Sequence, residues 1–258
     1  MEKEGQKGKE MLKVRDETKP WLVAYLTLGH PDPDTFLKAL EYLKDKAELV
    51  EIGIPPSFAK YDGPTIRKSY EKVKKMGITI DNFEELMEKA CKVFPKERLI
   101  AMTYYEDVKD KFEEFVEKVC TGGLLFADAV IDYVDEVEEI TARAKEKGKD
   151  VVYFVSPTTP DHIIKKVGEL SDPVVYLGVR PATGIPLPVG IPNLLNRVKA
   201  LVQKPIVVGF GLKLEEVPEA LRSGASGIVV GSAFVKALEE GFETFKEKVE
   251  EYLKVMGK

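Results

Sequence analysis

Cysteine and histidine are scarce in this 258-residue sequence, which contains two of each. Cys91 and Cys120 lie 29 positions apart in helical patterns, without a C-x-x-C pair. This arrangement predicts two buried thiols that act as small apolar side chains, rather than a disulfide framework or a metal site. His30 and His162 are 132 positions apart and lack an acidic or thiol cluster at ligand spacing, so they do not indicate a metal site either.

Long apolar runs and an excess of positive charge are also missing. The sequence has no stretch of 18 apolar residues, and its first twenty residues are too charged for a signal peptide. The formal net charge is −5, without the basic stripe that nucleic acids or anionic membranes require. We therefore expect a cytoplasmic protein with no nucleic acid and no membrane as a partner.

Asparagine and glutamine number only five in all, whereas 32% of the residues are charged. Proteins from hot environments often show this balance, because amides are thermolabile and ion-pair networks stabilise a fold better at high temperature. Our hypothesis is that the chain comes from a thermophile.

Short apolar runs alternate with amphipathic helical patterns, which is typical of repeated strand–helix units and a parallel sheet. Eight runs are expected to be strands: Trp21–Thr27, Leu49–Gly53, Leu99–Thr103, Gly123–Ala127, Val151–Val155, Val174–Gly178, Pro205–Val208 and Gly227–Val230. Eight such units favour a single-domain α/β fold, the (β/α)₈ TIM barrel, over residues 21–258. Residues 1–20 are then an N-terminal extension or a helix on the barrel floor. An open doubly wound sheet is the alternative, although its G-x-G-x-x-G fingerprint is absent after the first strand.

The helical patterns include two between the second and third strands, Thr65–Met76 and Asn82–Val93, separated by Gly77. Asp34 is predicted to cap the first helix of the barrel, because aspartate accepts hydrogen bonds from the free N–H groups of a helix start. One long helix is predicted for Phe234–Val255.

Two carboxylates stand where barrels hold their chemistry. Glu51 belongs to an apolar strand, and Asp62 follows eleven positions later in the loop before a helix. Burial of a carboxyl group raises its pKa toward the range of general acid–base catalysis, so the pair can share proton transfers on a small substrate. Structural interpretations remain open: Glu51 can bond a loop amide, and Asp62 can cap the helix that starts near Pro64.

Glycine-containing turns follow the sixth, seventh and eighth expected strands. They are Thr183-Gly184, Gly209-Phe210-Gly211 and Gly231-Ser232. Glycine lets main-chain N–H groups approach an anion, and a helix N-terminus adds partial positive charge. Because barrels often hold phosphate at the turns after the last two strands, these turns predict a phosphate site. The alternative is that the glycines only permit tight turns.

Taken in order, these residues resemble the α subunit of tryptophan synthase, in a form similar to archaeal members. The similarity runs from about Trp21 to the last helix and lies in Tyr25–Asp32, Glu51–Pro55, Asp62–Ile66, Met102–Tyr105, Thr183-Gly184, Val208–Gly211 and Val230–Ala233. It implies a (β/α)₈ barrel that cleaves indole-3-glycerol phosphate into indole and glyceraldehyde 3-phosphate in tryptophan biosynthesis. It also implies that the chain has no cofactor, since pyridoxal phosphate belongs to the β subunit that receives indole.

The resemblance carries over site residues by position. The family's acid–base glutamate falls on Glu51, and the aspartate that bonds the indole N–H falls on Asp62. The family's phosphate contacts fall on Gly184, Gly211, Gly231 and Ser232. The walls of the indole pocket fall on Tyr25, Tyr104, Tyr176 and Phe210.

Two segments depart from the family pattern. After Pro55 the chain reads Pro56-Ser57-Phe58-Ala59 where the family usually has Phe-Ser-Asp-Pro, and after Tyr105 it reads Glu106-Asp107 in place of Asn-Pro. The family contacts its β subunit through these segments, so we predict weak or non-standard docking to a β-type partner. Two alternatives remain: another phosphate-binding barrel isomerase or synthase, and a degenerate α-like protein that only binds or activates a β-type partner.

Overall fold

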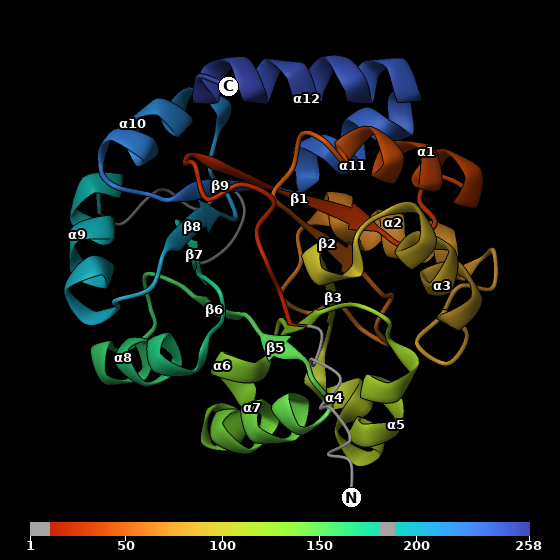
Figure 1. Ribbon diagram of the computed structural model, residues 1–258, viewed down its shortest axis with the longest axis horizontal. Coiled ribbons are helices and arrows are strands. Elements are labelled where there is room, and N and C mark those ends of the chain that lie inside the picture. The colour runs from red at the N-terminus through yellow and green to blue at the C-terminus, as the bar shows by residue number, and fades with distance from the viewer. Residues whose placement is uncertain (1–10, 181–188) are drawn as a thin grey trace, which may run out of the picture.

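Short runs rich in valine, leucine and isoleucine form the parallel strands of a computed structural model, which describes residues 11–180 and 189–258 (Figure 1). The strands are β1 Trp21–Thr27, β2 Leu49–Gly53, β3 Leu99–Thr103, β4 Gly123–Phe126, β5 Asp150–Val151, β6 Tyr153–Val155, β7 Val175–Gly178, β8 Ile206–Gly209 and β9 Gly227–Val230. They lie in the order β5-β4-β3-β2-β1-β9-β8-β7-β6, and their neighbours are parallel. The strands are almost wholly buried, as expected where helices cover a parallel sheet.

The barrel closes through a split strand. The predicted strand Val151–Val155 is interrupted at Val152, because β5 pairs with β4 whereas β6 pairs with β7. The Val152 N–H still donates to the Leu124 carbonyl at 2.9 Å, so the chain stays beside β4 across the interruption. The nine segments therefore make an eight-stranded barrel, in which β7, β8 and β9 are the sixth, seventh and eighth strands.

Helices surround the ring of strands (Figure 1). The α-helices are α1 Pro33–Leu43, α2 Pro64–Lys74, α3 Glu84–Val93, α4 Tyr105–Val108, α5 Phe112–Lys118, α6 Ala129–Asp132, α7 Val137–Glu146, α8 Asp161–Leu170, α9 Ile191–Leu201, α10 Val217–Arg222, α11 Ser232–Glu240 and α12 Phe242–Met256. Single 3₁₀ turns are η1 Lys96–Arg98, η2 Lys109–Lys111, η3 Val134–Glu136 and η4 Leu214–Glu216. Within the described ranges, no helix has the length and apolar character needed to cross a membrane.

Alternation along β1 separates two apolar layers. Trp21 and Val23 belong to the cluster inside the barrel, whereas Leu22 and Ala24 pack in the layer beneath the helices. Because paired residues of parallel strands face the same side, the register that sets Glu51 opposite Tyr25 turns both toward the interior. The barrel itself thus directs Glu51 inward.

The floor of the barrel is closed by the chain that precedes β1. The described part of the segment 1–20 contains no helix, and Leu12 packs inside the barrel against Gly123, where a larger side chain would collide with it. The fully buried Glu48 ties both chain ends to this floor. Its carboxylate accepts hydrogen bonds from the Leu22 N–H at 2.6 Å, from Arg15 at 3.1 Å and from Lys258 at 2.8 Å.

Two helix predictions need correction. The predicted single helix Phe234–Val255 is two helices, because Gly241 adopts φ 147°, a conformation that L-residues rarely enter and that ends α11. The first helix is capped by Asp32, whose carboxylate accepts from the Thr35 N–H, and Asp34 is the second residue of the helix, in its first turn. Both signals stand in the sequence, because Gly241 interrupts the helical pattern and Asp32 directly precedes Pro33, a residue suited to the first position of a helix.

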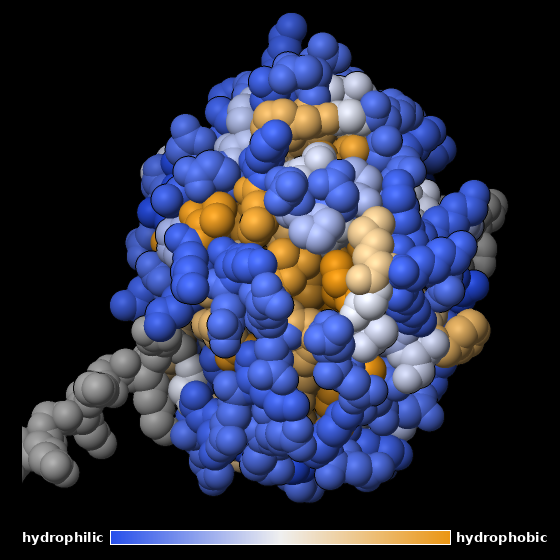
Figure 2. Space-filling view, turned by 90° about the vertical axis from the view of Figure 1, so that its right-hand side faces the viewer, coloured by the Kyte–Doolittle hydropathy of each residue, from blue (hydrophilic) through white to orange (hydrophobic). Residues whose placement is uncertain are grey.

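Hydrophilic residues, many of them charged in this sequence, dominate the outer face around α1, α2 and α3, and apolar residues show mainly in the recesses between them (Figure 2). Several of the charges form small networks: Lys118 lies 3.1 Å from Glu84 and 2.7 Å from Glu114, joining α3 to α5. Networks of this kind contribute more as temperature rises, which is consistent with the thermophile hypothesis.

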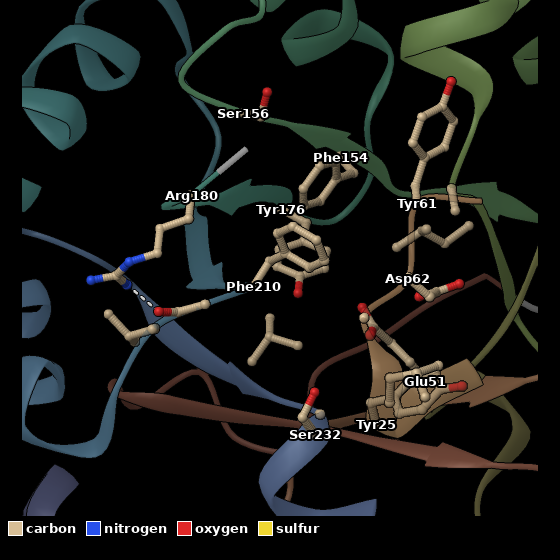
Figure 3. A pocket seen from close by; sticks show the side chains of 18 of the residues that line it. Tyr25, Glu51, Tyr61, Asp62, Phe154, Ser156, Tyr176, Arg180, Phe210 and Ser232 are labelled. Atoms are coloured by element: carbon tan, nitrogen blue, oxygen red, sulfur yellow. Dashed lines mark hydrogen bonds between the residues drawn. The ribbon is translucent and has the colours of Figure 1, made fainter. Parts of the chain in front are cut away.

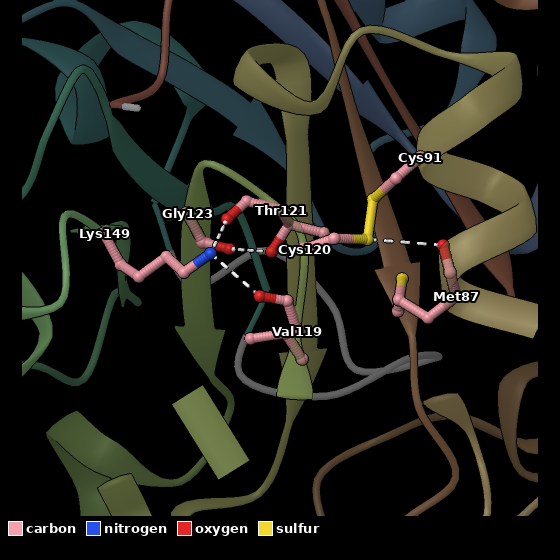
Figure 4. The surroundings of a disulfide bond; sticks show 7 residues. All are labelled: Met87, Cys91, Val119, Cys120, Thr121, Gly123 and Lys149. Atoms are coloured by element: carbon pink, nitrogen blue, oxygen red, sulfur yellow. Dashed lines mark hydrogen bonds between the residues drawn. A yellow bond between two sulfur atoms is a disulfide. The ribbon is translucent and has the colours of Figure 1, made fainter. Parts of the chain in front are cut away.

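The prediction of unpaired thiols is wrong, because Cys91 and Cys120 form a disulfide (Figure 4). It joins the end of α3 to the segment between α5 and β4, and the two Cα atoms are 6.4 Å apart. Residues 29 positions apart meet here because successive strand–helix units pack side by side, which cysteine spacing alone does not reveal. Disulfides are rare in the cytosol of mesophiles, whereas they also occur inside the cells of hyperthermophiles.

Reduction of this disulfide is expected to lower the melting temperature. The cross-link restricts the unfolded chain and contributes about 3 kcal/mol to stability. For a chain of this size, that corresponds to a loss of roughly 6–12 °C. Calorimetry with and without a reducing agent measures the shift. A variant carrying Cys91→Ala and Cys120→Ala should melt at the reduced value in both conditions, and identical melting of oxidised and reduced protein would contradict the prediction.

Candidate active site

A cavity of about 1050 Å³ lies at the carboxyl ends of the strands. Glu51, from β2, and Asp62, from the loop between β2 and α2, both line it. Figure 3 shows the two acidic side chains pointing into the same part of the cavity, with Tyr176 and Phe210 on another wall. The two predicted acids are therefore brought together, as the sequence pattern requires for shared proton transfer.

Glu51 is buried without compensation. Its residue is 2% exposed, and no hydrogen bond to its carboxylate occurs in the described part of the chain. Burial raises its pKa to about 8, because the charged form is poorly solvated. The structural interpretation, a glutamate bonded to a loop amide, is not what the structure shows. A carboxyl group in this state is largely protonated at neutral pH and can donate its proton.

Asp62 sits in a different environment. Burial raises its pKa to about 6, while a hydrogen bond from the Tyr104 hydroxyl, 2.7 Å away, and the charge of Arg67 oppose the rise. The residue before α2 that caps it is Gly63, and no side chain caps this helix. The interpretation of Asp62 as a helix cap is therefore wrong, and its carboxylate is free to face the cavity.

Three of the four predicted aromatic walls line the cavity: Tyr25, Tyr176 and Phe210. Tyr104 is absent from the lining within residues 11–180 and 189–258, and it is buried behind Asp62. Phe154, which sequence reasoning missed, lines the cavity and packs edge-on against Tyr176 and Phe210, with ring centroids 4.9 and 5.5 Å apart. These rings give the cavity an aromatic wall, against which the ring of a substrate can pack.

The predicted phosphate residues lie along another part of the lining. Gly211, Gly231 and Ser232 line the cavity, and Ser232 begins α11, whose N-terminus carries partial positive charge. The turn after β8 is left-handed at Phe210 (φ 48°) and Gly211 (φ 83°), and such a conformation is rare for phenylalanine. Gly184 lies outside the described residues.

Arg180 is a further lining residue that sequence reasoning missed. Its guanidinium group donates to the Gly211 carbonyl and to both oxygens of Glu216, at 3.1 and 2.6 Å. It thereby links the segment after β7 to the strained turn after β8. Its position directly beyond the sixth strand was the available signal.

His30 does not line the cavity, although it follows β1. It is 4% exposed, and its Nε2 atom lies 3.2 Å from the Glu239 carboxylate of α11. Burial lowers its pKa. Among the residues that the structure describes, no group of three or more His, Cys, Asp or Glu side chains has the geometry to hold a metal ion.

Comparison with known proteins decides between the remaining enzymes of this fold. The family model "Tryptophan synthase alpha chain" matches residues 11–258. The chain belongs to this family. It is 44% identical to the tryptophan synthase alpha chain of Saccharolobus solfataricus over 84% of its own length and 89% of the relative's. It is 40% identical to that of Sulfurisphaera tokodaii, over 85% and 90% of the two chains.

Solved structures agree with this assignment. A mutant alpha subunit from the hyperthermophile Pyrococcus furiosus superposes with a TM-score of 0.80 at 29% identity, covering 95% of this chain and all of that one. The alpha chain from the a2b2 complex of the same organism gives 0.78, with the same coverage and identity. The fold is a TIM barrel, and the chain is an α-type lyase of tryptophan biosynthesis that cleaves indole-3-glycerol phosphate. The isomerase or synthase alternative is therefore not favoured.

Proposed function

We propose that Glu51 and Asp62 together carry out the cleavage of indole-3-glycerol phosphate in the cavity at the mouth of this barrel. The observation that supports this most is the placement of two buried carboxyl groups in a single cavity, where burial raises the pKa of Glu51 to about 8 and that of Asp62 to about 6. Environments that separate two pKa values in this way are typical of acid–base pairs.

The reaction needs one proton added and one removed. Glu51 donates its proton to C3 of the indole ring, and Asp62 accepts a hydrogen bond from the ring N–H, where positive charge develops. The Glu51 carboxylate then takes the proton of the C3′ hydroxyl while the bond between C3 and C3′ breaks. Its electron pair flows back into the ring, which leaves indole and the aldehyde of glyceraldehyde 3-phosphate. Glu51 ends protonated, as it began.

The rest of the lining orients the substrate. The indole ring lies against Tyr176 and Phe210, and the phosphate lies at Gly211, Gly231 and Ser232, with Gly184 as a further proposed contact. Binding both ends of the substrate holds C3 near Glu51 and thereby lowers the entropic part of the barrier. The main-chain amides of the two turns and the N-terminus of α11 supply the positive potential.

Substitution of each of the two acids by its neutral amide tests these roles. Glu51→Gln is expected to lower kcat by roughly 10²–10⁴-fold, because no proton donor remains, and Asp62→Asn by about 10²–10³-fold, because the ring nitrogen loses its anion. Inhibition by glycerol 3-phosphate should be unchanged, since its phosphate binds elsewhere. Glu117→Gln, on the exposed face of α5, is the matched control and should keep full activity. Near-normal turnover in either active-site variant would refute the assignment.

The pH dependence follows from the two environments. The reaction needs Asp62 ionised and Glu51 protonated, so kcat/KM should rise through about pH 6 and fall through about pH 8. Activity is thus lost on the acid side when Asp62 gains a proton and on the alkaline side when Glu51 loses one. Steady-state rates across this range measure both limbs. In the Asp62→Asn variant the acid limb should disappear while the alkaline limb remains. If the acid limb persists in this variant, it belongs to another group.

We also propose a β-type subunit as partner, docked weakly or in a non-standard way. A structure of the Pyrococcus furiosus relative concerns mutual activation within an a2b2 complex. In this chain the two departing segments bond to each other: the Ser57 N–H donates to Asp107 at 2.9 Å, and Lys60 lies 3.4 Å from Glu106. These groups are then less available to a partner, while Phe58 beside them is 68% exposed.

Size-exclusion chromatography with a tryptophan synthase β subunit measures this docking. We expect a complex only at micromolar concentrations or above. Phe58→Ala should weaken it further, because an exposed aromatic side chain is a typical anchor of an interface. Co-elution at sub-micromolar concentration would contradict the proposal.

A further inference from the structure

The loop that carries Asp62 is held from outside the cavity by a neighbouring strand–helix unit. This loop covers residues 54–63, between β2 and α2. The Tyr61 hydroxyl donates to both carboxylate oxygens of Asp132, at 2.8 and 2.9 Å, and the Lys60 ammonium lies 2.6 Å from the same carboxylate. Asp132 is the last residue of α6, which follows β4. Figure 3 shows Tyr61 extending away from Asp62 and Glu51, out of the reacting part of the cavity.

The two residues that Asp132 holds directly precede Asp62. The Tyr61 main-chain N–H donates to the Tyr104 hydroxyl at 3.1 Å, and the same hydroxyl donates to the Asp62 carboxylate at 2.7 Å. The rings of Tyr61 and Tyr104 are also stacked, with centroids 6.3 Å apart. Because Tyr61 and Asp62 share Tyr104, a displacement of Tyr61 moves the contact that orients Asp62.

Other side chains also hold this loop: Arg67 of α2 donates to the main-chain carbonyls of Ala59 at 2.9 Å and of Lys60 at 2.7 Å. Glu106 is 3.4 Å from Lys60, and Asp107 binds the far end of the loop at Ser57. Asp132 alone, among the described acidic residues, is bonded to both Lys60 and Tyr61. Its side chain is 29% exposed and that of Lys60 31%, so water screens this contact less than it would a fully exposed pair.

We propose that Asp132 is a positioning residue for the lyase reaction. It clamps Lys60 and Tyr61 and thereby keeps the Asp62 carboxylate aimed at the indole N–H. Asp132 does not touch the substrate and acts only through Asp62. This inference rests on the proposed role of Asp62 and goes beyond it, because it assigns the order of that loop to the chain's own α6.

A double-mutant cycle on the full chain tests the clamp. Asp132→Ala should lower kcat by about tenfold to a hundredfold, as a misplaced catalytic group does, while inhibition by glycerol 3-phosphate stays unchanged. In the Asp62→Asn background the same substitution should change kcat by less than about twofold, because the group that it positions has already lost its charge. Asp132→Asn keeps an acceptor for Tyr61 and should give an intermediate loss.

The matched control is Glu117→Ala, which removes a comparable 2.6 Å contact with Lys147 on the outer helices and should leave kcat unchanged in both backgrounds. Equal losses from Asp132→Ala with and without Asp62, or a wild-type rate, would overturn the proposal. If the Asp132→Ala variant melts far below the wild type, the Asp132→Asn variant replaces it, and its loss of kcat is again compared between the wild-type and Asp62→Asn backgrounds.

Amide hydrogen exchange gives a readout that does not need turnover. Residues 54–63 should exchange faster in Asp132→Ala than in the wild type, whereas α11 should be unaffected. Unchanged exchange of this loop would overturn the clamp even in an active enzyme. An inactive wild type with a protected loop would instead refute the proposed catalytic role of Asp62 and leave the clamp supported.

Discussion

The burial of Glu51 without a hydrogen-bond partner is the constraint on which the rest of the structure depends. Removing an ionised carboxyl group from water costs more free energy than removing a protonated one, and the protonated state is the one that the proposed mechanism uses. Two apolar layers of the barrel, one inside the ring of strands and one beneath the helices, stabilise the fold and so offset this cost. An inward-facing position near the open end of a strand is the one place where a side chain is both desolvated and reachable by a substrate.

In the proposed mechanism Asp62 must stay ionised where Glu51 is protonated, and its position in a loop makes this possible. Asp62 receives a hydrogen bond from Tyr104 and feels the charge of Arg67, so its pKa stays below that of Glu51 although both are buried. Side chains of the β3 and β4 units contact this loop, and Arg67 of the following helix donates to its main-chain carbonyls. In the proposed mechanism, the strand supplies the acid and the loop supplies the anion, so two identical chemical groups take different roles.

Much of the fold was predictable because local signals agree with the global pattern. The strands β1, β2, β3 and β9 begin and end as predicted, since each apolar run is bounded by a polar residue, glycine or proline. Glu51 and Asp62 were also found from their positions in a strand and its following loop. The errors arose where two signals competed: the charged pattern of Phe234–Val255 hid Gly241, and helical periodicity around the cysteines hid their pairing.

The sequence by itself determined the alternation of strands and helices, the barrel class and the placement of Glu51 and Asp62 at the open end of the barrel, because these depend on periodicity and on which residue types stand at strand ends. Only the tertiary structure decided that Tyr104 supports Asp62 instead of lining the cavity, that Phe154 and Arg180 join the lining, and that Cys91 meets Cys120. Each of these is a contact between separate strand–helix units. Such contacts depend on the rotation and spacing of neighbouring strand–helix units around the barrel axis. These quantities produce no periodic pattern in the sequence.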